Sequence, residues 1–124
     1  MYLGLDLGTS GIKAMLINDA QQVIGVGHAG LTVQRPHPGW SEQAPGDWLH
    51  ATEEAIAALK AAHPKELAAV RGIGLSGHMH GATLIDAADQ VLRPCILWND
   101  TRSHAEAASL DADPRFRALT GNIV

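Results

Sequence analysis

The N-terminal stretch, residues 1–17, constrains the fold of this chain more than any other. It consists of an apolar run at 2–7, a connection of small residues at 8–11, and a second apolar run at 12–17. Two apolar runs of this length, joined by a short connection that contains glycine, predict a β-hairpin. The polar pair Asn18-Asp19 then closes the second strand.

One residue of the first predicted strand, Asp6, is out of place in an apolar run. A buried carboxylate is costly unless it finds a partner or a cation. The connection that follows offers backbone N–H groups, and Thr9 and Ser10 add hydroxyls, so it is suited to bind phosphate oxygens. Mg²⁺ prefers one or two carboxylates together with waters and phosphate oxygens, and Asp6 beside such a loop meets that preference. The alternative, which the residues alone leave open, is an Asx turn in which Asp6 bonds its own loop.

The rest of the chain predicts a mixed α/β domain. Pro36 and Pro38 require a loop after the third strand, and Pro45 is a residue favoured at the start of a helix. The predicted elements are strands at 2–7, 12–17, 22–33 and 70–76, a hairpin of 81–86 with 90–93, a short apolar run at 95–98, and helices at 45–64, 65–69, 103–110 and 114–119. Three strands, a helix and a further strand form an α/β layer pattern.

Composition and charge exclude several classes of protein. The net charge is −4 and the chain has no basic run, which argues against nucleic acid as a partner. No apolar run approaches the length of a membrane span, and Met1 leads directly into a predicted strand rather than a signal sequence. The single cysteine, Cys95, excludes an internal disulfide framework and fits a reducing compartment. We therefore expect a soluble cytoplasmic protein with no membrane partner.

Three further sequence patterns could suggest a dinucleotide or zinc site, and we interpret none of them in that way. The glycines at 25, 27 and 30 and those at 72, 74 and 77 both match the spacing of a dinucleotide-binding loop. That loop must open a helix, and neither pattern is followed by one. His78 and His80 would share one face of a strand, but a zinc site needs three or four protein ligands. A polar cluster beyond a strand end is the better interpretation, because α/β sheets bind ligands there.

Several segments carry a resemblance to known proteins. Asp6-Leu7-Gly8-Thr9-Ser10 resembles the first phosphate motif of the actin-like ATPase superfamily, which includes sugar kinases, actin and heat-shock chaperones. The segments 76–82 and 93–102 resemble the FGGY family of carbohydrate kinases, whose members include xylulokinases, glycerokinases, gluconokinases and ribulokinases. Within that family, Met79-His80-Gly81 and the loop 33–43 are most similar to the bacterial xylulokinases. The resemblance implies a ribonuclease-H-like N-terminal domain with a mixed sheet that opens β-β-β-α-β.

The resemblance also implies roles for individual residues. Asp6 would engage Mg²⁺ and the phosphates of ATP. The loop residues that would bind those phosphates are Gly8, Thr9 and Ser10. The residues that would contact an open-chain ketose are Met79 and His80, and those that would line the same cleft are Trp98, Asn99, Asp100 and Arg102. Two alternatives stay open, which are a core position for Trp98 and a helix N-cap for Asp100.

By the same resemblance, the full-length protein would transfer the γ-phosphate of ATP to D-xylulose and release ADP and D-xylulose 5-phosphate. The first alternative is another kinase of the family, of the ribulokinase, gluconokinase or glycerokinase type. The second is a non-catalytic sugar- or nucleotide-binding remnant. In the family, the proton-accepting aspartate, the second phosphate motif and the adenosine pocket lie beyond the first domain. We therefore expect residues 1–124 to be a truncated N-terminal domain, incomplete and inactive alone, whose parent could form a homodimer.

Overall fold

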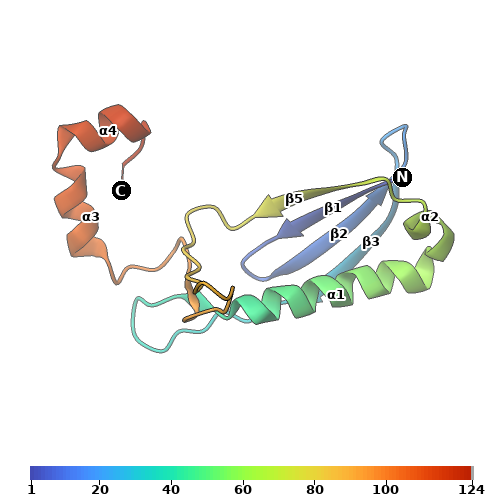
Figure 1. The fold of residues 1–124 in the computed structure, drawn as a ribbon, viewed down its shortest axis with the longest axis horizontal. Coiled ribbons are helices and arrows are strands. Elements are labelled where there is room, and N and C mark those ends of the chain that lie inside the picture. Colours follow the sequence, from blue (N-terminus) through green and yellow to red (C-terminus); the bar gives the residue numbers. More distant parts are fainter. Residues whose placement is uncertain (124) are drawn as a thin grey trace.

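The computed structural model describes residues 1–123, which form two sheets and four helices (Figure 1). The strands are β1 (Tyr2–Leu7), β2 (Gly11–Ile17), β3 (Val23–Gly30), β4 (Glu42–Gln43), β5 (Gly72–Gly77) and β6 (Cys95–Ile96). The helices are α1 (Pro45–Ala62), α2 (Pro64–Ala68), α3 (His104–Asp111) and α4 (Pro114–Thr120).

The main sheet has the strand order β3-β2-β1-β5. β1 and β2 form the predicted antiparallel hairpin, with Leu7 opposite Ile12, and β3 continues antiparallel on β2. β5 lies parallel to β1, after a crossover through α1 and α2. Parallel neighbours require a crossover of this kind. The mixed sheet that opens β-β-β-α-β is thus confirmed.

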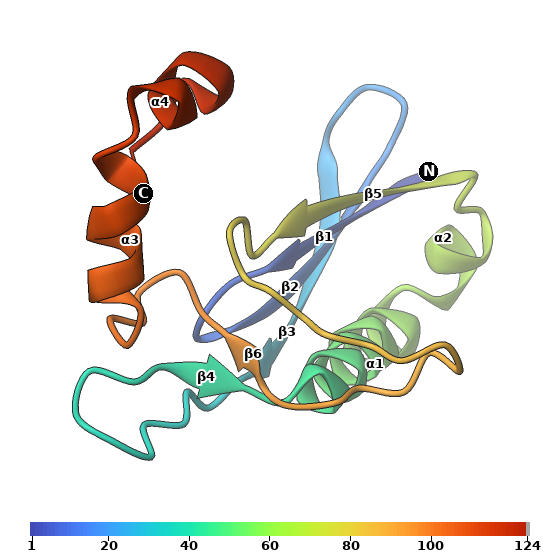
Figure 2. The same cartoon turned by 60° about the vertical axis from the view of Figure 1, so that its left-hand side comes forward.

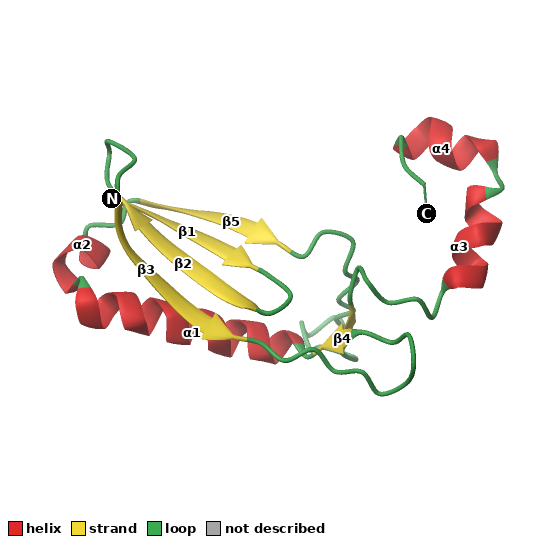
Figure 3. Ribbon diagram, turned by 180° about the vertical axis from the view of Figure 1, so that it is seen from behind, coloured by secondary structure: helices red, strands yellow, loops and turns green. Residues whose placement is uncertain are grey.

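α1 runs along one face of the main sheet (Figure 2 and Figure 3). The buried residues between helix and sheet are Leu3, Ile12, Ala14, Leu16, Ala29, Ala51, Ala55 and Leu59. The helix lies so close to β3 that a Cβ at Gly27 would be 2.0 Å from the carbonyl oxygen of Ala55. Glycine on the strand and alanine on the helix therefore allow this close packing.

A second sheet, of β4 and β6, joins two segments that are far apart in the sequence. Gln43 is paired with Cys95, and the Leu97 N–H donates to the Ser41 carbonyl oxygen at 2.9 Å. All four of these residues are buried. The sheet therefore fixes the loop before α1 against the segment that follows β6. α3 and α4 extend away from both sheets, and neither helix contains a buried residue (Figure 1).

The strand predictions differ from the structure at the end of β3 and at β4. β3 ends at Gly30 rather than at 33, because the chain leaves β2 after Leu31 and Gln34 pairs instead with Glu42 of β4. β4 itself lies where the sequence predicts a loop, since two residues are too few to show an alternating pattern.

The predicted hairpin of 81–86 with 90–93 is present only as a tight turn. One β-bridge joins Ile85 to Val91, and neither arm forms a regular strand. The apolar side chains of both arms are exposed, so no packing within the described residues extends the pairing.

The helices begin and end close to the predicted positions. α1 begins at Pro45 and ends at Ala62, two residues before Pro64, as expected from the helix-starting and helix-ending effects of proline. α3 and α4 lie within two residues of their predicted bounds. Over residues 1–123, no helix is both long enough and apolar enough to cross a bilayer.

Candidate functional site

The connection between β1 and β2, called the phosphate loop here (residues 8–10), is closed by a backbone hydrogen bond. The Gly8 N–H donates to the Gly11 carbonyl oxygen at 2.9 Å, and a Cβ at Gly8 would lie 3.1 Å from that oxygen. Glycine therefore lets the loop turn this tightly. Thr9 is partly buried, whereas Ser10 is exposed. The three residues predicted to bind phosphates thus lie on one compact turn.

Asp6 lies on the face of the main sheet opposite α1. It is directly opposite Lys13 on β2 and Ser76 on β5, and Lys13 is in turn opposite His28 on β3. Residues opposite each other in a sheet point to the same face. The four side chains therefore form one polar row that crosses the sheet beside the phosphate loop. Asp6 is exposed, so its carboxylate is accessible to a ligand.

Lys13 is a candidate phosphate-binding residue that the sequence interpretation missed. It lines a pocket of about 380 Å³ together with Asp6, Gly8, Ser10 and His28. A lysine ammonium binds phosphate as a point charge. The signal was present in the sequence, because hairpin register and strand alternation place Lys13 on the face that carries Asp6.

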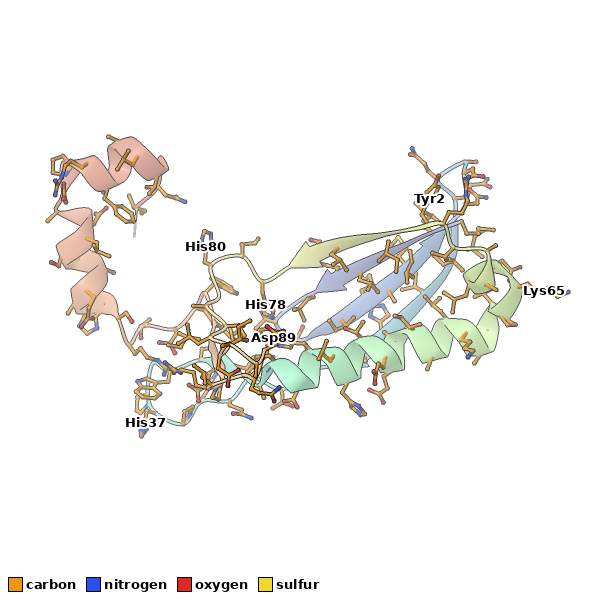
Figure 4. The ribbon with its side chains drawn as sticks, viewed as in Figure 1. Tyr2, His37, Lys65, His78, His80 and Asp89 are labelled. Atoms are coloured by element: carbon orange, nitrogen blue, oxygen red, sulfur yellow. The ribbon has the colours of Figure 1, made fainter. Side chains whose placement is uncertain are left out.

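β5 ends in a strained loop that carries the residues predicted to contact sugar. Gly77 has a φ of 137°, and a Cβ there would lie 2.4 Å from the Leu7 carbonyl oxygen. His78 and His80 have φ values of 28° and 68°. Residues other than glycine rarely adopt positive φ, and such strain is concentrated at functional sites. Figure 4 shows both histidines on this loop beyond the end of β5.

His78 and Met79 line the same pocket beside the phosphate loop but differ in exposure. The ring of His78 lies 5.0 Å from the ring of Trp48 on α1, with an interplanar angle of 30°. Burial lowers the pKa of His78, and its Nε2 is buried without a hydrogen-bond partner among the described residues. Met79 is 70% exposed and lines a pocket beside the phosphate loop. His78 thus packs against the helix, while Met79 is accessible to a ligand.

Trp98 contacts the phosphate loop and shares a pocket with the loop after β5. Its indole N–H donates to Thr9 Oγ1 at 3.3 Å. Trp98, Thr9, Asp6 and Met79 line one pocket of about 230 Å³. His80 and Trp98 line a neighbouring pocket of about 540 Å³ on the side of α4. Because Trp98 is 63% exposed, a core position for it within this domain is wrong.

Asp100 and Arg102 lie outside that pocket, in a cluster of paired charges. The Asp100 carboxylate accepts a hydrogen bond from the Ser41 N–H at 2.6 Å and others from Arg102 at 2.7 to 3.0 Å. Arg102 also donates to Glu42 at 2.8 Å, and its guanidinium lies 3.6 Å from the ring centroid of Trp40. These hydrogen bonds from Arg102 hold the pKa of Asp100 well below its usual range.

In this charge cluster, Asp100 and Arg102 direct their hydrogen bonds to other groups of the protein rather than to a ligand. The Asp100 side chain is 2% exposed and that of Arg102 12%. Asp100 does not cap a helix either, because Ser103 occupies the N-cap position of α3. Asn99 is different, since its Oδ1 is buried without a partner among the described residues. The residues that the structure brings together around the pocket are Asp6, Gly8, Thr9, Met79 and Trp98, with His80 in the adjoining pocket.

Asp6 is the carboxylate that both pockets beside the phosphate loop share. Within the part of the chain that the structure describes, no group of three or more His, Cys, Asp or Glu side chains could hold a metal ion by itself. Asp6 beside the N–H groups and hydroxyls of the phosphate loop does fit an Mg²⁺ ion bound together with a nucleotide. Such an ion needs only one or two carboxylates, because waters and phosphate oxygens supply its other ligands. The donor set is therefore that of a magnesium–nucleotide site rather than an all-protein metal site.

Known proteins match this chain over nearly its whole length. Xylulose kinase of Escherichia coli K12 is 50% identical, and the match covers 100% of this chain and 25% of that protein. The structure of a xyloylose kinase from Brucella ovis superimposes with a TM-score of 0.98 at 71% identity, over 99% of this chain and 26% of the other. For xylulose kinase from Rhodospirillum rubrum the TM-score is 0.83 at 34% identity, over 89% and 22% of the two chains.

The chain thus spans about a quarter of the length of the curated relatives that it matches. Residues 1–124 also match the N-terminal domain of the FGGY family of carbohydrate kinases. The resemblance inferred from the phosphate loop and from the segments 76–82 and 93–102 is therefore confirmed. This chain belongs to the FGGY family of carbohydrate kinases and corresponds to the N-terminal domain of that family.

Proposed function

We propose that the full-length protein to which this domain belongs transfers the γ-phosphate of ATP to D-xylulose. One observation supports this above all, which is that the phosphate loop, Met79 and Trp98 line the same pocket. Phosphoryl transfer depends mainly on positioning and on neutralising charge, so a kinase must hold the phosphate donor beside the acceptor hydroxyl. The choice of D-xylulose rests on the similarity to xylulose kinases.

A neighbouring pocket on the other side of Asp6 supplies hydrogen-bond donors and charge for the phosphates. The N–H groups and hydroxyls of Thr9 and Ser10 would bind phosphate oxygens, and Lys13 would add a positive charge. Asp6 would hold Mg²⁺ directly or through waters. Bound Mg²⁺ with ATP would neutralise phosphate charge and orient the γ-phosphate.

At the sugar end, apolar side chains lie beside a few polar ones, as is typical of small-molecule sites. Met79 and the indole of Trp98 would form the apolar wall against the carbon chain. His80 would bond sugar hydroxyls. The Oδ1 of Asn99 is buried, so we assign it no sugar contact. For Asp100 we propose a supporting role, in which the charge cluster holds the segment that carries Trp98, instead of a sugar contact.

Three other features of the full-length protein are also proposals. The catalytic base is assigned to a part of the protein outside this domain. A cytoplasmic location is supported by the free buried thiol of Cys95, which fits a reducing compartment. A homodimer rests on the family resemblance alone, and size-exclusion chromatography with light scattering tests it.

The function is tested by a coupled ADP-release assay on the full-length protein. D-Xylulose, D-ribulose, D-gluconate and glycerol are compared, and we expect the highest kcat/KM for D-xylulose. His80→Ala should raise the KM for D-xylulose about tenfold, because a hydrogen bond to the substrate is lost, with little change in the KM for ATP. A higher kcat/KM for another substrate would place the protein in a different branch of the family. ATP binding without phosphorylation of any substrate would support a non-catalytic protein.

A further inference from the structure

The side-chain amide of Gln43, in β4, contacts the phosphate loop from the interior of the protein. Gln43 is 1% exposed. Its Nε2 donates to the carbonyl oxygen of Thr9 at 2.8 Å and to that of Thr32 at 3.3 Å, and its Oε1 accepts from the Trp48 indole N–H at 3.0 Å. A buried polar side chain is costly unless its groups are paired, and here both ends of the amide are paired.

The chemistry of the partners fixes the orientation of this amide. An indole N–H can only donate, so it must face the oxygen of Gln43. The two carbonyl oxygens can only accept, so they must face the NH₂ group. Gln43 therefore bridges Trp48 on α1 to Thr9 in a single arrangement.

Thr9 is thereby held from two sides. Gln43 binds its carbonyl oxygen from within the protein, and Trp98 binds its hydroxyl from the pocket. Two backbone hydrogen bonds also support the loop, from the Gly8 N–H to the Gly11 carbonyl oxygen at 2.9 Å and from the Leu31 N–H to the Ser10 carbonyl oxygen at 3.0 Å, but neither involves Thr9. The Gln43 contact therefore holds the Thr9 peptide group, at the centre of the loop, in its place.

We propose that Gln43 is a positioning residue that fixes the phosphate loop in the conformation that binds ATP, with Trp48 as its anchor. This inference rests on the proposed function, because it assigns the nucleotide phosphates to the loop. It extends that function to a residue that touches neither substrate. Phosphate oxygens must meet N–H groups at defined positions, so a small displacement of the loop weakens binding.

The first test replaces Gln43 by methionine, which keeps the volume and removes both hydrogen-bonding ends. The matched control is Ser41→Ala, because Ser41 is fully buried beside β4 and its hydroxyl has no partner among the described residues. Amide hydrogen exchange of residues 8–11 is measured in the full-length protein without nucleotide. We expect about tenfold faster exchange in Gln43→Met and unchanged exchange in Ser41→Ala.

The second readout is steady-state kinetics with the same variants. Gln43→Met should raise the KM for ATP about tenfold, with a change of less than about twofold in the KM for D-xylulose. A general loss of stability would not separate the two constants. Equal increases of both KM values, or a wild-type KM for ATP with unchanged loop exchange, would overturn the proposal.

A third variant covers the case in which Gln43→Met does not fold. Trp48→Phe removes the N–H that anchors Gln43 and keeps an aromatic ring against His78. It should speed exchange of residues 8–11 and raise the KM for ATP by about threefold, and wild-type values for both would refute the inference. If the wild-type protein fails to phosphorylate D-xylulose, the proposed function fails, while hydrogen exchange still decides the role of Gln43.

Discussion

The substitution Asp100→Asn distinguishes two roles for this carboxylate, a sugar contact and a support of the fold. The side chain is 2% exposed and accepts hydrogen bonds from Ser41 and Arg102. Asparagine keeps one oxygen acceptor but replaces the other by an NH₂ group, which would face the donors of Arg102. The substitution therefore removes one charge from a buried pair and creates a clash between donors.

The magnitude follows from the geometry of the cluster. Removing one partner of a buried ion pair destabilises a protein by about 3–5 kcal/mol. In the variant, Arg102 can still pair with the carboxylate of Glu42, which lies 2.8 Å away, so its positive charge keeps one buried partner. We therefore expect a loss of about 3 kcal/mol in the free energy of unfolding of this domain, at the lower end of that range.

The assay is urea unfolding of the full-length protein, followed by tryptophan fluorescence, because Trp40 stacks on Arg102. Asp113→Asn is the matched control. Asp113 and Arg115 have the same spacing and a similar ion pair, but the arginine side chain is 84% exposed and asparagine caps α4 as well as aspartate does. The control should unfold like the wild type. A wild-type unfolding curve for Asp100→Asn, together with a raised KM for D-xylulose, would refute the structural role.

Three further predictions concern pH, packing and catalysis. The pKa of Asp100 is lowered in the folded state, so its contribution to stability is complete above its unfolded-state pKa of about 3.9 and is lost as the pH falls toward the folded-state value. The difference between the urea midpoints of wild type and Asp100→Asn should therefore shrink steadily as the pH is lowered below about 4. Gly27→Ala would put a Cβ 2.0 Å from the Ala55 carbonyl oxygen and should lower the free energy of unfolding by about 2 kcal/mol. A Cβ at Gly30 meets nothing within 4 Å, so Gly30→Ala is the control, and equal urea midpoints for the two variants would contradict the packing. Asp6→Asn should lower kcat at least about 100-fold and weaken the Mg²⁺ dependence of the rate. The urea midpoint should not shift, because the Asp6 side chain is exposed. A wild-type kcat would exclude Asp6 as the magnesium residue.

Local patterns in the sequence predicted the hairpin and the helices well. The apolar runs at 2–7 and 12–17 and the flanking prolines of α1 act over a few residues, so they can be recognised without knowledge of the fold. The same is true of the phosphate loop, whose small residues and preceding Asp6 lie within one short segment. Lys13 was missed although strand alternation would have placed it on the face of Asp6.

The parts that the sequence could not predict depend on contacts between distant residues. The amide of Gln43 meets Thr9 across 34 positions, and the indole of Trp98 meets Thr9 across 89. Nor does the sequence reveal that Asp100 is paired with Ser41, because that contact requires β4 to lie beside β6. The resemblance supplied Trp98 and Met79 as site residues, but only the structure separates them from the charge cluster of Asp100.

The most direct test of the proposed function is analysis of the products that the full-length protein forms from ATP and D-xylulose. Phosphorus NMR and mass spectrometry identify the products, with Asp6→Asn as the control. With the wild-type protein we expect a xylulose monophosphate and ADP in equal amounts. With Asp6→Asn we expect both products to form much more slowly. Formation of ADP and inorganic phosphate without a sugar phosphate, or no reaction at all, would contradict the claim that this domain holds the phosphate donor beside the ketose.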